Sequence, residues 1–279
     1  MFGPLVSTEW LQSSISDPSL VVLDASLNST IVKGKPASTH ANWQIPGSRV
    51  FDIDGTFCDK TSRLPHMMPS EEVFVRGVRE LGIDDKSKVV IYDRLGIYSS
   101  PRARWMFKAM GHDNVAVLNG GFPAWVRAGL PIEGLNAVKV PLGSFVAKPY
   151  LHLFCEAEDI IDALTDVQSV VLDARSMRRV LGLDPEPREA LRLGHMPNAL
   201  NLPFEEVLSN GEMKSTEDLV ELFKPLLRLE QKLFTTCGSG VTACIVAFAA
   251  ELIGHASIFV YDGSWCEWGQ PSELPVTTE

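Results

Sequence analysis

Residues 232–255 read KLFTTCGSGVTACIVAFAAELIGH and form the most informative segment of the chain. A short apolar run leads into Cys237, a Gly-Ser-Gly loop follows, and the remaining residues are almost all apolar. A short apolar run that a loop joins to a helical stretch is typical of a buried parallel strand, and we expect the helix to pack against the sheet. Cys237 would then lie at the carboxyl end of a strand, where open α/β sheets bind ligands.

The same pattern occurs twice along the chain. Three pairs of segments match in order: VVLDAS (21–26) with VVLDAR (170–175), KVVIYD (88–93) with KLFTTC (232–237), and VAVLNGGFPAW (115–125) with IFVYDGSWCEW (258–268). Such self-similarity indicates a duplication. We therefore predict an α/β protein of two tandem domains, each a parallel β-sheet flanked by helices on both faces. The tryptophans at equivalent repeat positions, Trp125 and Trp268, are predicted to be core residues.

The repeats also set the expected domain boundaries. We predict a first domain over residues 1–138, a linker over 139–156 that contains Gly and Pro without a sustained period, and a second domain over 157–279. Asp93 takes the position of Cys237 in the first repeat. The second domain is therefore the catalytic one in this prediction, and the length of 279 residues agrees with two domains.

Composition excludes several classes of function. The net charge of -10 argues against nucleic acid as a partner, because phosphate neutralisation needs excess Lys and Arg. No stretch approaches the ~18 apolar residues that suggest a membrane span, and the first ten residues lack a signal-peptide pattern. The five cysteines include no CxxC pair, so neither disulfides nor a metal site is expected. We predict a cytoplasmic protein without a cofactor.

The loop after Cys237 suits a reactive thiol. Gly238 and Gly240 allow several backbone N–H groups to point inward, and the following helix adds its N-terminus, so the loop can hold an anion and favour the thiolate. A merely buried cysteine would not need this loop. A phosphatase-like cysteine enzyme would need an arginine six residues after the cysteine, where this chain has Ala243. A phosphatase is therefore disfavoured.

Several further motifs carry a family resemblance. In chain order they are FDID (51–54), LPHMMP (64–69), SSPRARWMF (99–107), EPR (186–188), GHMPNALNLPF (194–204), CGSGVTA (237–243) and YDGSWCEW (261–268). With these motifs the chain resembles the 3-mercaptopyruvate sulfurtransferases of the two-domain rhodanese superfamily over nearly its whole length. In that family the second repeat carries the nucleophile.

The resemblance implies a sulfur transfer. Cys237 thiolate would attack the sulfur of 3-mercaptopyruvate, release pyruvate and keep a persulfide, which a thiol acceptor such as thioredoxin or glutathione, or cyanide, then removes. It assigns substrate binding to the loop residues Gly238, Gly240, Val241 and Thr242. It also assigns supporting catalytic roles to three residues, namely Ser239, His66 and Asp54. A loop-shaping role for Ser239 and a structural role for His66 remain open.

An arginine cluster stands out in the acidic second half of the chain. Residues 141–279 hold 10 Lys and Arg against 21 Asp and Glu, yet five arginines fall within 18 residues: Arg175, Arg178, Arg179, Arg188 and Arg192. The resemblance assigns Arg179 and Arg188 to the carboxylate of the substrate, which guanidinium groups bind bidentately. Arg178 could exchange roles with Arg179. The alternative is that these arginines pair on the surface with Asp184, Glu186 and Glu189.

Two other functions remain open. Thiosulfate sulfurtransferases resemble the chain closely, but their loop typically carries Arg and Lys at the positions of Gly238 and Ser239. Thiosulfate is a dianion that benefits from positive charge there, whereas mercaptopyruvate carries one carboxylate and needs a more distant clamp. The second alternative is a non-catalytic sulfur-binding protein. The intact Cys237 loop argues against this alternative.

Overall fold

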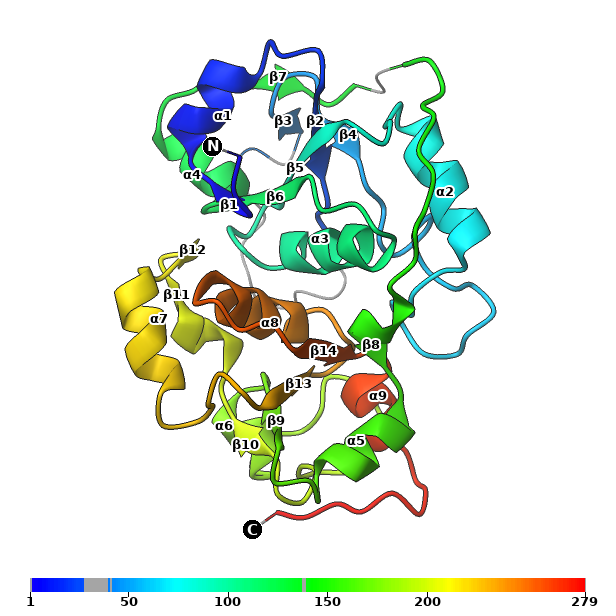
Figure 1. Ribbon diagram of the computed structural model, residues 1–279, viewed down its shortest axis with the longest axis vertical. Helices are drawn as coiled ribbons and strands as arrows, with labels where there is room; N and C mark the ends of the chain where they lie inside the picture. Colours follow the sequence, from blue (N-terminus) through cyan, green and yellow to red (C-terminus); the bar gives the residue numbers. More distant parts are fainter. Residues whose placement is uncertain (1, 28–39, 41, 137–138, 279) are drawn as a thin grey trace. The chain divides into compact units, whose positions relative to one another are not determined.

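The computed structural model describes residues 2–27, 40, 42–136 and 139–278 and divides into two compact units (Figure 1). The first unit comprises Met1–Lys60, Met68–Tyr150 and Asn210–Glu212, and the second comprises Thr61–Met67, Leu151–Ser209 and Met213–Glu279. Two short segments therefore belong to the unit that is remote in sequence. The boundaries at 138/139 and 156/157 stay a prediction.

Within the described residues, each unit contains one five-stranded parallel sheet. Across the first sheet the order is β1 (Leu5–Val6), β6 (Val115–Leu118), β5 (Lys88–Tyr92), β2 (Leu20–Asp24) and β4 (Arg49–Val50). Across the second it is β8 (Phe154–Cys155), β14 (Ile258–Tyr261), β13 (Lys232–Thr236), β9 (Ser169–Asp173) and β10 (Leu200–Asn201). The equivalent strands follow in the same order, which confirms the duplicated α/β fold. Two short ribbons pair β3 (Trp43–Gln44) with β7 (Glu133–Gly134) and β11 (Leu208–Ser209) with β12 (Glu212–Met213).

Helices cover the sheets of both units. The first unit has α1 (Thr8–Ser14), α2 (Glu71–Glu80), α3 (Ser100–Ala109) and α4 (Gly121–Arg127). The second has α5 (Ala157–Ala163), α6 (Met177–Val180), α7 (Thr216–Phe223), α8 (Ala243–Leu252) and α9 (Ser264–Trp268), with 3-10 turns at Leu151–Leu153 and Phe204–Val207. No helix of the described ranges is long and apolar enough to cross a bilayer.

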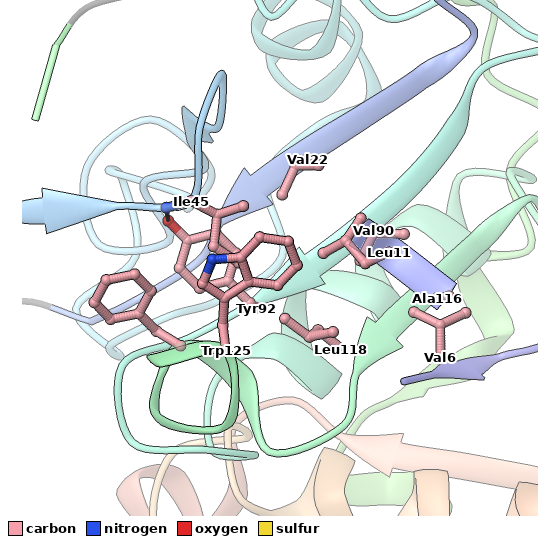
Figure 2. Close-up of a cluster of buried hydrophobic side chains, with 10 residues drawn as sticks. Val6, Leu11, Val22, Ile45, Val90, Tyr92, Ala116, Leu118 and Trp125 are labelled. Atoms are coloured by element: carbon pink, nitrogen blue, oxygen red, sulfur yellow. Dashed lines mark hydrogen bonds between the residues drawn. The ribbon is translucent and has the colours of Figure 1, made fainter. Parts of the chain in front are cut away.

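Alternate strand residues build one core layer of the first unit (Figure 2). Val90 and Tyr92 on β5 point to the same face, and they join a cluster that includes Leu11 of α1 and Trp125 of α4. Side chains two apart on a strand share a face of the sheet, so this layer holds α1 and α4 against that face. Trp268 occupies the matching layer of the second unit, and both tryptophans are buried as expected.

The helix after Cys237 is buried as its composition predicts. Residues 243–250 of α8 are all buried, and α8 contacts β13 and β14. The helix ends at Leu252, two residues before Gly254, which takes a φ of 89°. A glycine with positive φ after the last turn is a common helix terminator. Gly111 follows α3 in the same way with a φ of 80°, so both repeats end this helix by the same device.

Candidate functional site

Cys237 is the first residue after the central strand β13 of the second sheet. Its side chain is 1% exposed, and β13 lies between β9 and β14. Residues 237–242, which we call the Cys237 loop, connect β13 to α8. Gly240 takes a φ of 72°, a left-handed conformation that glycine adopts without strain. The thiol therefore lies at the carboxyl end of a central strand and before a helix N-terminus.

Ser264 anchors this loop from α9. Its Oγ accepts the backbone N–H groups of Cys237 (3.3 Å) and Gly240 (3.1 Å) and donates to the carbonyl of Tyr261 (2.8 Å). Ser264 has a φ of 49°, and the equivalent residue of the first repeat, Gly121, has a φ of 53°. A non-glycine residue in this conformation costs roughly 1–2 kcal/mol. No role is predicted for Ser264 from the family motifs, although the change from Gly120-Gly121 to Gly263-Ser264 between the repeats is a visible signal in the sequence.

Replacing Ser264 by alanine should therefore loosen the loop. Two buried N–H groups would lose their acceptor, at about 1–3 kcal/mol each, so we expect about 2 kcal/mol or more of lost stability in the second unit. Urea unfolding of this unit measures the loss. Ser215→Ala is a suitable control, because the Ser215 hydroxyl accepts the N–H of Asp218 at the exposed start of α7 and its removal should cost about 1 kcal/mol. An S264A protein as stable as the wild type would contradict the anchoring role.

Asp93 of the first unit lies at the place that Cys237 occupies in the second. The N–H of Phe122 donates to the carbonyl of Asp93 at 2.9 Å, as the N–H of Trp265 does to that of Cys237. The buried Asp93 carboxylate accepts the N–H groups of Leu95, Tyr98, Ser99 and Ser100 and the hydroxyl of Ser100, at 2.7–3.0 Å. Burial raises the pKa of this carboxyl, and the Ser100 and Tyr98 donors oppose that rise. The loop that follows β5 in the first unit thus surrounds a carboxylate with backbone N–H donors.

Arg175 is a structural member of the arginine cluster. Its side chain is fully buried, bonds the carboxylates of Asp173 (2.6 Å) and Glu186 (2.8 Å) and stacks over the Trp265 ring at 3.9 Å. Arg192 likewise donates to backbone carbonyls, at 2.8 Å to Leu274. The Arg175 guanidinium and the two terminal nitrogens of Arg192 are thus bonded within the fold, so neither residue presents a free guanidinium edge to a substrate.

Arg179 lies beside the Cys237 loop. A Cβ placed on Gly238 would be 3.2 Å from its guanidinium Nη2, and the same nitrogen bonds Glu186 at 2.5 Å. Arg178, in contrast, is exposed and pairs with Asp184 at 2.8 Å. Glu186 is buried and holds both Arg175 and Arg179, so it positions the cluster and is more than a surface partner. The sequence alone predicts Glu186 only as a surface partner of the arginines.

Arg188 retains an unused charge. It is half-buried, and within the described ranges it has neither an ion-pair nor a hydrogen-bond partner. Arg188 also acts on Cys266 of α9. Burial raises the pKa of the Cys266 thiol to about 11, while the positive charges of Arg188 and Arg179 oppose that rise. Cys237 raises the pKa of the same Cys266 thiol. Arg188, Arg179 and Cys237 therefore all lie near Cys266.

Comparison with known proteins agrees with this geometry. The family described as "Rhodanese-like domain" matches residues 7–128 and again residues 156–271. The chain belongs to the rhodanese-like family. It is 36% identical over 273 residues to the 3-mercaptopyruvate sulfurtransferase of Escherichia coli K12, covering 97% of this chain and 96% of that protein. The mouse enzyme of the same name is 39% identical over 285 residues, covering 98% and 95%.

The rhodanese-like relatives also include an enzyme that is named for a different sulfur donor, thiosulfate. The thiosulfate sulfurtransferase of mouse is 39% identical over 277 residues, covering 96% of this chain and 92% of that protein. Among solved structures, the E. coli 3-mercaptopyruvate sulfurtransferase SseA superposes with a TM-score of 0.82 at 34% identity, covering 94% of this chain and 98% of that one. The chain is thus a two-domain rhodanese-like sulfurtransferase, and identity alone does not separate the two donors.

The remaining predicted residues of this rhodanese-like chain are placed as follows. Ser239 is half-buried in the Cys237 loop, Val241 is buried and Thr242 immediately precedes α8. His66 is buried with a φ of 61° and belongs to the second unit, whereas Asp54 is half-buried in the first. The predicted link of Asp54 and His66 with the loop serine therefore stays a prediction.

Proposed function

We propose that the protein is a 3-mercaptopyruvate sulfurtransferase that carries sulfur on Cys237 as a persulfide. The observation that carries this proposal is the combination of an uncharged Cys237 loop with a nearby arginine, Arg188, whose charge is uncompensated. A carboxylate needs such a charge, and a sulfur nucleophile needs a loop that stabilises an anion. In this proposal the persulfide passes to a thiol acceptor, such as thioredoxin or glutathione, or to cyanide.

The chemistry needs only groups of the chain. The Cys237 thiolate attacks the sulfur of mercaptopyruvate, the carbon–sulfur bond breaks, and the electron pair leaves with the pyruvate enolate, which then takes a proton. The Cys237 loop would stabilise the negative outer sulfur through backbone N–H groups. The equivalent loop of the first unit, residues 93–100, supports this role, because four of its backbone N–H groups donate to the Asp93 carboxylate.

The donor's carboxylate would bind Arg188, with Arg179 as its partner. Glu186 already engages Arg179, so Arg188 supplies the charge and Arg179 supplies a second set of donors. Glycine at 238 fits this arrangement, since any longer side chain there would press on the Arg179 guanidinium. Ser239 would donate a hydrogen bond to the substrate, and we propose that His66 and Asp54 assist the proton transfers.

Thiosulfate is the competing donor, and the mouse relative of that name is a specific reason to test it. The loop from Cys237 to Ala243 contains no cation for a dianion. We expect a higher kcat/KM for 3-mercaptopyruvate than for thiosulfate when both are assayed with cyanide as acceptor. A higher kcat/KM for thiosulfate would contradict the proposal that Arg188 and Arg179 bind the carboxylate of the donor.

Mass spectrometry tests the persulfide directly. After treatment with 3-mercaptopyruvate and removal of small molecules, the intact chain should be about 32 Da heavier, by one sulfur. Cys237→Ser should abolish this adduct. Cys244→Ser is the matched control, because the Cys244 thiol lies in α8 and donates to the Gly240 carbonyl at 3.3 Å, so its loss should leave the adduct intact. No adduct on Cys237 would favour the non-catalytic reading.

We also propose that the protein works in a reducing compartment, the cytoplasm. All five cysteines are free thiols, which fits such a compartment. An Arabidopsis relative carries the word mitochondrial in its name, so fractionation of the source cells with an antibody against the chain is the direct test.

A further inference from the structure

A second thiol lies beside the Cys237 loop. Cys266 belongs to α9, whose first turn bonds the loop through its backbone. The N–H of Trp265 donates to the carbonyl of Cys237, and the N–H of Cys266 donates to the carbonyl of Gly238, both at 2.9 Å. These two successive bonds hold the segments side by side in register. The backbone of Cys266 is therefore bonded to the Cys237 loop one residue beyond the nucleophile, at the peptide that joins Gly238 to Ser239.

The two thiols share an environment that differs from that of two other cysteines. Cys237 is 1% and Cys266 4% exposed, and within the described ranges neither sulfur has a hydrogen-bond partner. Cys244 donates to the carbonyl of Gly240 at 3.3 Å, and Cys58 to that of Asp54 at 3.1 Å. Both thiols are thus buried on segments that backbone hydrogen bonds join, and within the described ranges neither sulfur is held by a hydrogen bond of its own.

The charges around Cys266 are those of the candidate site. Arg188 and Arg179 act on its thiol, together with the carboxylate of Glu186 and the sulfur of Cys237. The groups that we assign to the substrate therefore also act on the Cys266 thiol. Cys266 thus lies on a segment bonded to the loop of the nucleophile and within the electrostatic influence of the same charged groups.

We propose that Cys266 is an internal thiol acceptor for the Cys237 persulfide, a role that rests on the proposed function. The Cys266 sulfur attacks the inner sulfur of the persulfide, the bond between the two persulfide sulfurs breaks, and hydrogen sulfide leaves with the thiol proton. A Cys237–Cys266 disulfide remains. The Cys266 sulfur is oxidised and the outer sulfur is reduced, so this step needs no external oxidant. A dithiol reductant then reopens the site.

This step would be slow at neutral pH. With a pKa of about 11, Cys266 is thiolate in only about one chain in ten thousand at pH 7, because burial outweighs the opposing effect of Arg188 and Arg179. The persulfide then persists long enough for an external acceptor at neutral pH. Internal release should accelerate about tenfold per pH unit between pH 7 and 10.

The test follows one loading of the protein in the absence of any thiol. Wild type, Cys266→Ser and Cys266→Ala are treated with a single equivalent of 3-mercaptopyruvate, transferred to pH 9 and followed by intact mass and a sulfide assay. The wild-type adduct, about 32 Da heavier, should give way to a species about 2 Da lighter than the reduced chain, with one sulfide per chain. Both variants should keep the adduct at least tenfold longer.

Three outcomes separate the inferences. Equal rates of adduct loss in wild type and both variants would overturn the role of Cys266 and leave the proposed function intact. A peptide that links Cys237 to Cys244 would also overturn it. Failure of the adduct to form in every protein would instead remove the proposed function itself. Cys58→Ser, a change at a half-buried thiol of the first unit, should behave as the wild type.

Discussion

Replacing Asp93 by alanine is expected to destabilise the first unit by about 4 kcal/mol or more. The change leaves four backbone N–H groups and the Ser100 hydroxyl without their acceptor in a buried site. Each unsatisfied donor costs about 1–3 kcal/mol, and water that enters the space recovers part of the sum. Because single domains have only about 5–15 kcal/mol of stability, the urea transition of this unit should move to much lower denaturant.

Asp17→Ala is the matched control for this prediction. Asp17 is a partly exposed carboxylate that pairs with Lys88 at 2.8 Å and accepts the N–H and hydroxyl of Ser19 at 2.9 and 2.7 Å, so its loss should cost about 1–2 kcal/mol, well below the loss expected for D93A. Formate or acetate should partly rescue D93A, because an anion that enters the vacated loop stabilises the folded state by mass action, and neither should help D17A. A loss below about 1 kcal/mol in D93A would show that the loop does not depend on its carboxylate.

The fold was largely predictable because its signals are local. The runs 88–93 and 232–237 correspond to β5 (Lys88–Tyr92) and β13 (Lys232–Thr236). The residue just beyond each strand is Asp93 in the first unit and Cys237 in the second. The exchange of segments such as Thr61–Met67 between the units was not predictable. Unit membership of a short irregular segment depends on long-range packing, which leaves no periodic pattern in the sequence.

The site was predictable in its residue types and less so in its pairings. The sequence contains an arginine cluster next to acidic residues, but which arginine keeps a free charge depends on where each side chain points. The buried carboxylate of Glu186 forms ion pairs with Arg175 and Arg179, and the exposed carboxylate of Asp184 pairs with Arg178. Ser264 differs, because its signal appears only when the repeats are compared: it stands where the first repeat has Gly121, whereas its φ of 49° and its bonds to the Cys237 loop leave no local sequence pattern.

Arg188→Ala should reduce kcat/KM for 3-mercaptopyruvate about 100-fold. A charge-assisted hydrogen bond contributes about 1.5–3 kcal/mol, and about 2.7 kcal/mol corresponds to this factor. Thiosulfate has no carboxylate to lose this hydrogen bond. Its kcat/KM should therefore change by less than about threefold, which corresponds to less than about 0.7 kcal/mol. Arg178→Ala is the control for charge alone, because Arg178 is exposed and paired with Asp184, and it should leave both donors unaffected.

Arg188→Lys separates geometry from charge in the same assay. Lysine keeps the positive charge but loses the planar fork that binds a carboxylate bidentately, so we expect an intermediate loss of about tenfold. Arg179→Ala is less informative, because it also frees the buried Glu186 carboxylate, which then faces the incoming donor with one partner fewer. Equal losses for mercaptopyruvate and thiosulfate in R188A would mean that Arg188 supports the fold or the general potential of the site, and that the carboxylate is bound elsewhere.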